Sequence, residues 1–394
     1  MRATSEVEKK RRWPKYVLAT LLILVGLFYI GGGWYFSNAL RDDLLVVQPP
    51  TESYDLQVVA VGEGSIRLLE TDGNDDELRS KGVYGLTWEG GVGQLDEIIA
   101  AEAIEVTRAF TVLEGNAPSV GDSADANKNL YPPDPQRAHG VEFEEVVYGS
   151  PLGPMAAWLV PGDTDTWAVM VHGKGADRDE TLRIMAPFID AGHPVLSIRY
   201  RNDLDSPLDP SGYYQYGVTE WQDVEGAVQF AVESGAAEVI LVGLSTGAAH
   251  TTSFLDESTL RGKVIGAVYD SPNIDVEAAV DFAASQRSLP VIGTDIPTSL
   301  VTVAKFFAQV RFGLDWNELD YIPVASNVNF RMLVFHGTAD DTVPLSVSAS
   351  LEESSRFGVT LIKADDGLHV GSWNIAPEAY ETAVSRYLQS LGRG

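Results

Sequence analysis

Apolar and polar positions alternate in short runs between residues 54 and 114. The runs are rich in β-branched side chains, and glycine-rich breaks separate them. A period of two is typical of half-buried strands, and glycines between the runs favour turns. The predicted strands are residues 56–61, 65–69, 83–88 and 104–113. Residues 44–135 are therefore predicted to form a small β-rich region and a connecting loop, with at most one short helix near residues 96–102.

From residue 141 onward, the pattern changes to strands that alternate with helices. Residues 141–147 and 155–160 flank a turn rich in Gly and Pro, and they are predicted to form an antiparallel hairpin. The alternation that follows predicts an α/β fold, with a mostly parallel sheet and helices on both of its faces. The further strands are 167–171, 194–199, 238–242, 264–269, 331–335 and 359–363. The helices include 180–191, 220–234, 346–357 and 377–391. We expect residues 141–394 to form one domain.

Near the N-terminus, residues 16–36 are 21 consecutive positions without a charged side chain. A helix of that length crosses the roughly 30 Å hydrocarbon core of a bilayer. Aromatic residues stand at both ends of the run, as they do at membrane interfaces: Trp13, Tyr16, Trp34 and Tyr35. Up to Lys15 there are six Lys or Arg against two Glu. Because basic flanks stay in the cytoplasm, we predict a cytoplasmic tip (1–15), a single-pass signal-anchor in the cell membrane (16–40) and an extracytoplasmic remainder.

A cleavable signal peptide is the alternative interpretation of the same segment. Ser37-Asn38-Ala39 has the small residues of a cleavage site, and cleavage there would release a secreted protein. The apolar run is longer than the roughly 7–15 residues of a signal-peptide core. The length of the run therefore favours the retained anchor.

Composition excludes several classes of function. The 394 residues include no cysteine, so disulfides and thiolate metal sites are excluded. The formal net charge is −28, and such a surface repels the phosphate backbone of nucleic acids. We therefore expect no nucleic-acid partner.

One motif joins a predicted strand to a predicted helix. Residues 239–242 read as a buried strand and residues 248–255 as a helix, with Gly243-Leu244-Ser245-Thr246-Gly247 between them. The two glycines allow a tight turn, which lifts the serine hydroxyl above the edge of the sheet beside a helix N-terminus. This context marks Ser245 as a candidate nucleophile.

A second glycine-rich segment, Val171-His172-Gly173-Lys174-Gly175, ends the first strand of the predicted parallel sheet. Main-chain N–H groups in such a turn suit a carbonyl oxygen that becomes negative during acyl transfer. One interpretation is an oxyanion hole formed by the N–H groups of Lys174 and Thr246. An ordinary glycine-rich turn, with His172 in the core, is the alternative.

A residue suited to acid–base chemistry follows each of the last two predicted strands, 331–335 and 359–363. Asp340 follows the first of them, where a carboxylate can hold a histidine in one tautomer. His369 follows the last strand in a glycine-containing loop, and of the six histidines it alone does so. Asp341, next in sequence, and Asp270, at the end of an earlier strand, compete with Asp340 as the partner of His369.

These motifs together resemble the α/β-hydrolase superfamily, and in particular bacterial membrane-anchored hydrolases of that fold. They cover the chain from about residue 141 to the end in the superfamily's order of nucleophile, acid and histidine. The resemblance implies that Ser245 is the nucleophile, Asp340 the acid and His369 the base, with no metal or cofactor. It does not extend to the first 135 residues.

The resemblance implies a carboxylester hydrolase that forms an acyl-enzyme on a small ester or acyl substrate. A serine peptidase or amidase of the same fold is the first alternative, and a non-catalytic cell-surface binding module is the second. The superfamily hosts many reactions, so the fold by itself names no substrate. The sequence leaves the oligomeric state open.

Residues 271–325 are too long for a simple connection between two strands. Within them, residues 300–312 place Val303, Phe306, Phe307 and Val310 on one helical face. That face either packs on the sheet or belongs to a lid that lines the acyl pocket, because caps are inserted at this point in the superfamily.

Overall fold

The computed structural model describes residues 3–48, 54–71, 75–290 and 293–392. Pro49-Pro50, predicted to end a short linker, lies outside these ranges. The chain divides into two units. The helical unit comprises Met1–Val46 with Val280–Asn317, and the main unit comprises Val47–Ala279 with Glu318–Gly394.

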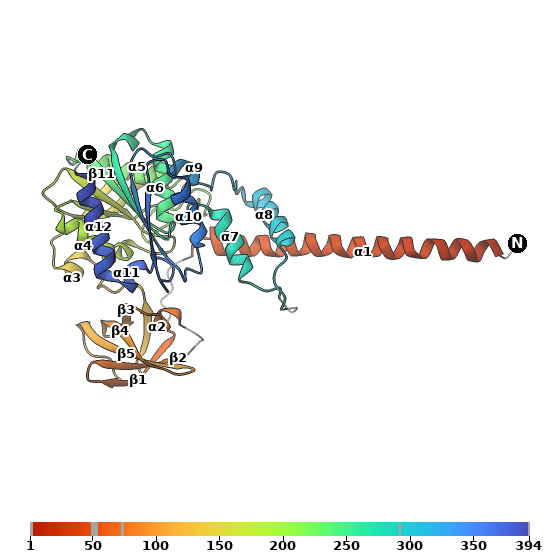
Figure 1. Cartoon of the computed structure of the whole chain (residues 1–394), viewed down its shortest axis with the longest axis horizontal. Coiled ribbons are helices and arrows are strands. Elements are labelled where there is room, and N and C mark those ends of the chain that lie inside the picture. Colours follow the sequence, from red (N-terminus) through yellow and green to blue (C-terminus); the bar gives the residue numbers. More distant parts are fainter. Residues whose placement is uncertain (1–2, 49–53, 72–74, 291–292, 393–394) are drawn as a thin grey trace. The chain divides into compact units, whose positions relative to one another are not determined.

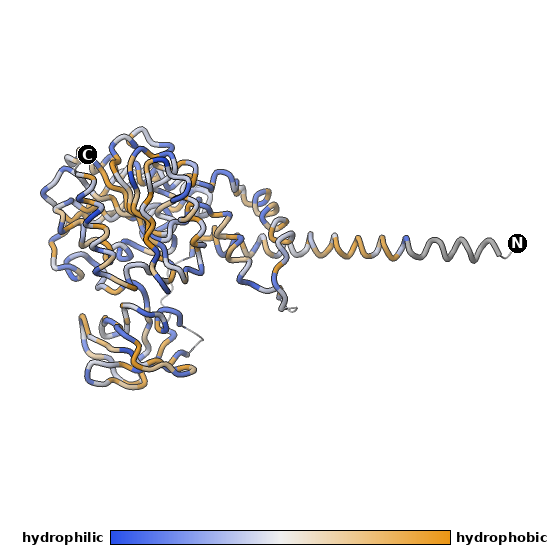
Figure 2. Tube along the Cα trace, in the orientation of Figure 1, coloured by the Kyte–Doolittle hydropathy of each residue, from blue (hydrophilic) through white to orange (hydrophobic). Residues whose placement is uncertain are grey.

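The helical unit is built on one long helix, α1 (Ala3–Leu40), which continues into a five-residue π-helix, η1 (Arg41–Leu45). The stretch Lys15–Leu45 is long and apolar enough to cross a membrane, a criterion that signal sequences also meet. Its apolar side chains are exposed, among them Leu21 and Leu24. Figure 2 shows this stretch as the hydrophobic part of the helix.

A second helix of this unit, α8 (Thr298–Phe312), lies along α1. The four apolar residues predicted to share a face of α8 divide into two pairs. Val303 and Phe307 lie against Gly33 of α1, whereas Phe306 and Val310 are exposed. Packing of α8 on α1 is an arrangement that the sequence did not predict. The chain reaches α8 through α7 (Val276–Ser285).

The main unit begins with a closed barrel of six antiparallel strands, in the order β1-β2-β5-β4-β3-β6. The strands are β1 (Leu56–Gly62), β2 (Ser65–Glu70), β3 (Tyr84–Trp88), β4 (Gly91–Ala101), β5 (Glu105–Gly115) and β6 (Ser123–Asn127). Alternate side chains such as Leu56 and Val58 on β1 and Ile66 and Leu68 on β2 fill its core. Closure leaves no open sheet edge in this small region.

The short helix predicted near residues 96–102 is wrong, because β4 runs through Ala101. Its pairing with β5 shifts register on both sides of Ile98. Bulges of this kind place an extra residue in the strand and interrupt the two-residue alternation. Without that alternation, the sequence pattern does not predict a strand here.

The second part of the main unit is an eight-stranded mixed sheet in the order β14-β13-β12-β11-β9-β10-β8-β7. Strands β9 to β14 are parallel, and the predicted hairpin, β7 and β8, adds two antiparallel strands at one edge. The strands are β7 (Glu144–Ser150), β8 (Gly153–Val160), β9 (Thr166–Val171), β10 (Val195–Ile198), β11 (Glu238–Leu244), β12 (Val264–Asp270), β13 (Met332–Gly337) and β14 (Val359–Ala364).

Helices cover both faces of this sheet (Figure 1). On one face lie α5 (Trp221–Glu233), α6 (Thr246–Glu257) and α10 (Leu345–Ser354), and on the other lie α4 (Leu182–Asp190) and α12 (Pro377–Leu391). Strand β11 contributes to both cores: Val239 and Leu241 point to one face, and Ile240 and Val242 to the other. Burial on both faces explains why this strand reads as a continuous apolar run. The short helices are α2 (Asp76–Arg79), α3 (Pro135–His139), α9 (Ile322–Ala325) and α11 (Ser372–Ile375).

A buried arginine, Arg108 on β5, holds the turn around α2 against the barrel wall. Its guanidinium donates hydrogen bonds to five main-chain carbonyls, those of Glu77, Leu78, Ser80, Gly82 and Asp96. Arg108→Met would leave these acceptors without their donor, and we expect a loss of roughly 3 kcal/mol or more in the free energy of unfolding. Denaturant unfolding, followed by circular dichroism, measures this loss of stability.

The matched control is Arg67→Met on β2, because the Arg67 side chain is half exposed and lies 3.7 Å from Glu105. An exposed pair of this kind contributes at most about 1 kcal/mol. Equal stability of the two variants would contradict the role assigned to Arg108.

Candidate active site

Ser245 stands on a strained turn between β11 and α6. Its backbone has φ 49° and ψ −117°, a region that side-chain-bearing residues rarely adopt. The two glycines of the motif are required by contact. A Cβ at Gly243 would lie 2.6 Å from the Ala248 backbone, and one at Gly247 would lie 2.2 Å from the carbonyl oxygen of Val171. The turn therefore forms as the motif predicts.

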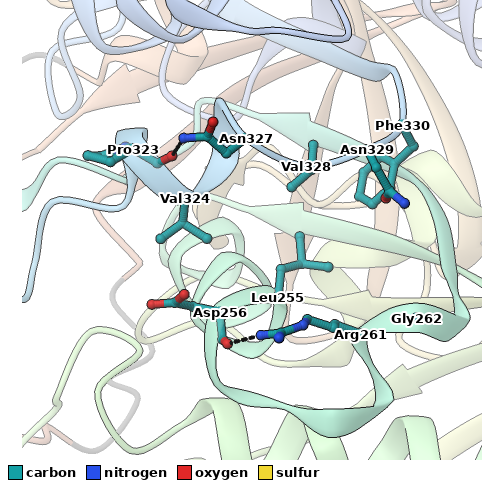
Figure 3. Close-up of a pocket in the computed structure, with 10 residues that line it drawn as sticks. All are labelled: Leu255, Asp256, Arg261, Gly262, Pro323, Val324, Asn327, Val328, Asn329 and Phe330. Atoms are coloured by element: carbon teal, nitrogen blue, oxygen red, sulfur yellow. Dashed lines mark hydrogen bonds between the residues drawn. The ribbon is translucent and has the colours of Figure 1, made fainter.

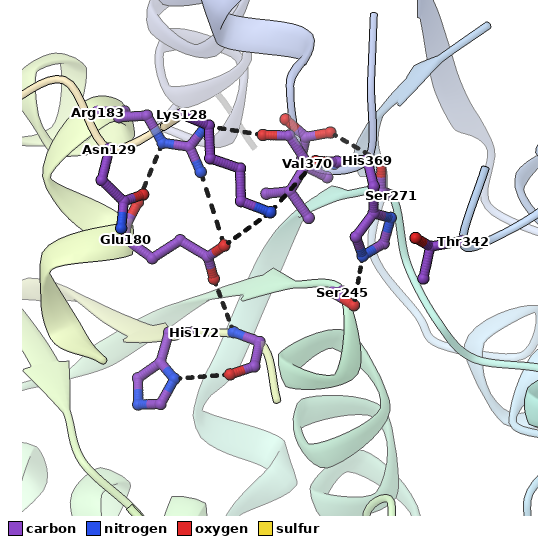
Figure 4. Close-up of polar contacts among 12 residues, drawn as sticks. Lys128, Asn129, His172, Glu180, Arg183, Ser245, Ser271, Thr342, His369 and Val370 are labelled. Atoms are coloured by element: carbon purple, nitrogen blue, oxygen red, sulfur yellow. Dashed lines mark hydrogen bonds and ion pairs between the residues drawn. The ribbon is translucent and has the colours of Figure 1, made fainter. Parts of the chain in front are cut away.

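The structure brings Ser245, His369 and Asp340 into one hydrogen-bonded chain. His369 Nδ1 lies 2.9 Å from Asp340 Oδ2 and 3.1 Å from Oδ1. Because a carboxylate only accepts, Nδ1 carries the proton and Nε2 is left to accept from Ser245. The Ser245 hydroxyl donates to Nε2 over 2.8 Å. Figure 4 shows Ser245 and His369 in this arrangement.

Asp340 is held in its ionised form. Burial opposes the charge, but the hydrogen bond from His369 and the bond from the Val343 N–H outweigh it, so the pKa of this carboxyl lies below its ordinary value. The N–H of Thr342 also donates to Asp340 Oδ1, over 2.9 Å.

The two competing carboxylates have other surroundings. Asp341 is exposed and accepts a hydrogen bond from the Thr342 hydroxyl. Asp270 is buried at the end of β12, where it accepts a hydrogen bond from the Ser372 hydroxyl over 2.8 Å. Burial raises the pKa of Asp270 to about 7. Of the three carboxylates, the contacts found in the described ranges join Asp340 to His369.

The glycine-rich segment after β9 lies beside Ser245. A Cβ at Gly173 would be 3.1 Å from the Ser245 Cβ, a tight contact, so glycine eases this approach. The Gly173 N–H donates to Glu180 over 2.8 Å. Thr246 is the first residue of α6, and its N–H belongs to the first helical turn, where intrahelical partners are lacking. Lys174 is the next residue after Gly173, so its N–H belongs to the same glycine-rich segment.

His172 is a buried structural residue. Its Nδ1–H donates to the Gly173 carbonyl over 2.9 Å, and its Nε2–H donates to Asp203 over 3.0 Å. Burial opposes protonation, yet the Asp203 carboxylate prevails and raises the pKa of His172 to about 9. The ring stacks on Tyr200. These contacts fix the segment that enters the site.

A charged cluster behind the site was missed in the sequence. Buried Glu180 lies 3.6 Å from Lys128 Nζ and 3.7 Å from Arg183 Nη2. Burial opposes its ionisation, but these two cations hold the pKa of Glu180 below its ordinary value. Lys128 Nζ also lies 3.4 Å from the His369 carbonyl oxygen, and Arg183 donates to the Val370 carbonyl over 2.8 Å (Figure 4). No periodicity or motif singled these residues out.

A cavity of about 550 Å³ in the main unit lies away from this site (Figure 3). Its wall includes Leu255 and Asp256 at the C-terminal end of α6, whereas Ser245 precedes the first residue of that helix. Asn327 and Phe330 line the opposite side. The cavity is therefore separated from Ser245 by the length of α6. Among the residues that the structure describes, no group of three or more His, Cys, Asp or Glu is placed to hold a metal ion.

Comparison with known proteins identifies the fold. No family model matches the sequence. The uncharacterized protein YqkD of Bacillus subtilis is 24% identical over 239 residues, which cover 59% of this chain and 74% of YqkD. The Pyrococcus furiosus esterase Pf2001 matches in two crystal forms at a TM-score of 0.51, with 18% and 17% identity. The matches cover 65% and 66% of this chain and 95% and 93% of the esterase. The fold is that of the α/β hydrolases.

Replacement of Asp270 by asparagine should change how stability depends on pH. The folded pKa of about 7 lies above the unfolded value of about 3.9. Stability that comes from neutral Asp270 is therefore fully present below about pH 4 and is lost as the pH rises to about 7. Asp270→Asn stays neutral, so it should gain stability relative to wild type between pH 5 and pH 8. Urea unfolding at the two pH values measures the gain.

The exposed Asp341→Asn serves as the control and should follow wild type at both pH values. Parallel pH profiles for wild type and Asp270→Asn would contradict the raised pKa.

Proposed function

We propose that the protein is a serine hydrolase that cleaves carboxylic esters through an acyl-enzyme on Ser245. The observation that carries this proposal is the hydrogen-bonded chain from the Ser245 hydroxyl through His369 to Asp340. A nucleophile, an oriented base and an anion that stabilises the charged base are the parts that acyl transfer requires. The likeness of the fold to a solved esterase agrees with the proposal.

In the proposed reaction, His369 Nε2 takes the Ser245 proton as Oγ attacks the ester carbonyl carbon. The carbonyl oxygen becomes negative and receives hydrogen bonds from the N–H groups of Lys174 and Thr246. The imidazolium of His369, stabilised by Asp340, then protonates the leaving alcohol. Water, activated by the same imidazole, attacks the acyl-enzyme and releases the carboxylic acid. The sum is one ester and one water converted to one acid and one alcohol.

We also propose that α1 is a retained membrane anchor, with its N-terminus in the cytoplasm and the catalytic residues outside. Arg311 of α8 bonds Ser37 and Asn38 and covers the Trp34 ring. All three partners precede the potential cleavage point after Ala39, so cleavage would strip α8 of these contacts. The basic flank before residue 16 supports the orientation.

Labelling with a fluorophosphonate probe tests the nucleophile. Wild type should be labelled at one site, and Ser245→Ala should not be labelled, because no other described serine shares the strained turn and a bond to His369. The same two proteins should be assayed on p-nitrophenyl esters and on aminoacyl p-nitroanilides. Equal labelling of both proteins would overturn the assignment of Ser245. Turnover of anilides alone would replace esterase by peptidase.

Substitution of the acid tests the role of Asp340. Asp340→Asn is nearly isosteric but favours the wrong tautomer of His369, and a loss of roughly 10⁴-fold in kcat is expected from the serine-protease example. The adjacent Asp341→Asn is the matched control and should stay within about tenfold of wild type, or about 1.4 kcal/mol in the barrier. Ester turnover and melting temperature are measured together. If Asp270→Asn is crippled and Asp340→Asn is not, Asp270 is the acid.

A further inference from the structure

Helices α1 and α8 of the helical unit run side by side in the same direction. Residues further along α1 contact residues further along α8. Tyr29 forms a hydrogen bond with Ser299, the Trp34 ring contacts the Phe307 ring, and Ser37 accepts a hydrogen bond from Arg311. The approach depends on glycine. A Cβ at Gly33 would lie 2.5 Å from Val303 and 2.9 Å from Phe307, and one at Gly32 would lie 2.9 Å from Leu300. Small residues allow this kind of close helix pairing in membranes.

Arg311 attaches the C-terminal end of α8 to residues 34–38 of α1. Its guanidinium carbon lies 3.5 Å above the centroid of the Trp34 ring. Its Nη1 donates to Ser37 Oγ over 2.5 Å, and its Nη2 donates to Asn38 Oδ1 over 2.7 Å. All of these partners lie at the outer end of the apolar run of α1, so Arg311 stands where a membrane interface is expected.

Residues 298–307 of α8 accompany the last apolar turns of α1. Ser299 stands level with Tyr29 and Phe307 with Trp34, both inside the uncharged run 16–36. From residue 29 to residue 36 the run rises about 10 Å at 1.5 Å per residue. If α1 spans a bilayer, this part of α8 lies at the depth of the outer leaflet.

Two large apolar side chains of α8 are exposed between the level of Ser299 and that of Arg311. Phe306 is 60% exposed and Val310 is 66% exposed, beside the face that packs on α1. Apolar side chains of α1 are also exposed, for example those of Ile30 and Tyr35. Both helices therefore expose large apolar side chains, as expected of a surface in contact with lipid.

We propose that α8 is a second membrane element, which lies in the outer interfacial layer beside α1 and turns Phe306 and Val310 toward lipid. It does not span the bilayer, because its 15 residues are only about 22 Å long. Lys305 of α8 pairs with Asp281 of α7 over 2.7 Å, and a charged pair of this kind suits the interface rather than the hydrocarbon centre. This proposal rests on the proposed anchor α1.

The test uses the absence of cysteine from the chain. Single-cysteine variants of the full chain, each labelled with an environment-sensitive dye, are reconstituted in lipid nanodiscs. The sites are Phe306 and Val310 on α8, Leu24 in the middle of α1 and Phe357 of the main unit, all exposed. Phe357 is the control, an exposed side chain that is not proposed to contact lipid. Retained fluorophosphonate labelling shows that each variant is folded.

Dyes at Phe306 and Val310 should be quenched several-fold more by lipids labelled near the headgroup than by lipids labelled near the acyl terminus, and should resist aqueous iodide. The dye at Leu24 should show the reverse lipid preference. If the α8 sites behave like Phe357 while Leu24 is lipid-quenched, α8 lies in water and the inference fails while the anchor stands. Iodide quenching at Leu24 as well would overturn the anchor itself. Stronger quenching of the α8 sites by the deep label would contradict an interfacial position.

Discussion

The strained backbone at Ser245 is the constraint on which the site depends. A residue in this conformation costs of order 1–3 kcal/mol and persists only when its surroundings hold it. The Ser245 N–H donates to the Asp270 carbonyl over 3.0 Å, and the Ser245 carbonyl accepts from the N–H groups of Ala248 and Asn273. Ser271 and Val370 also have positive φ, and the Val370 N–H donates to Ser271 Oγ. Three strained residues thus share one end of the sheet, supported by the double-sided core beneath it.

Buried charged groups position the residues of the site, in addition to the packing of the core. The single carboxylate of Glu180 reaches the Gly173 N–H on one side and the cations of Lys128 and Arg183 on the other. Those cations in turn contact the carbonyls of His369 and Val370. The segment beside Ser245 and the loop that carries His369 are therefore positioned against a common buried anion. Such a network is stable only while every member is present.

The sequence predicted the parts of the fold that local pattern determines. The apolar run of β11, the glycines around Ser245 and the loop positions of Asp340 and His369 are local signals, and the structure brings these three side chains together. Barrel closure and the packing of α8 on α1 depend on contacts between distant segments, which no periodicity encodes. Nothing in the sequence marks Glu180 and Lys128 as partners, because only the fold brings them together. Bulges in β4 hid a strand by interrupting its alternation.

The segment that follows the barrel belongs structurally to the α/β sheet rather than to the barrel. Leu130 is buried in the core beneath α4 and α12, and the Tyr131 ring lies 5.8 Å from that of Trp373. Lys128 precedes them and reaches Glu180. A recombination event that exchanged the barrel for another module would leave the core of the α/β sheet and the Glu180 cluster intact only if its breakpoint fell before Lys128. The structural unit built on the α/β sheet therefore begins earlier than the domain that the alternation of strands and helices delimits in the sequence.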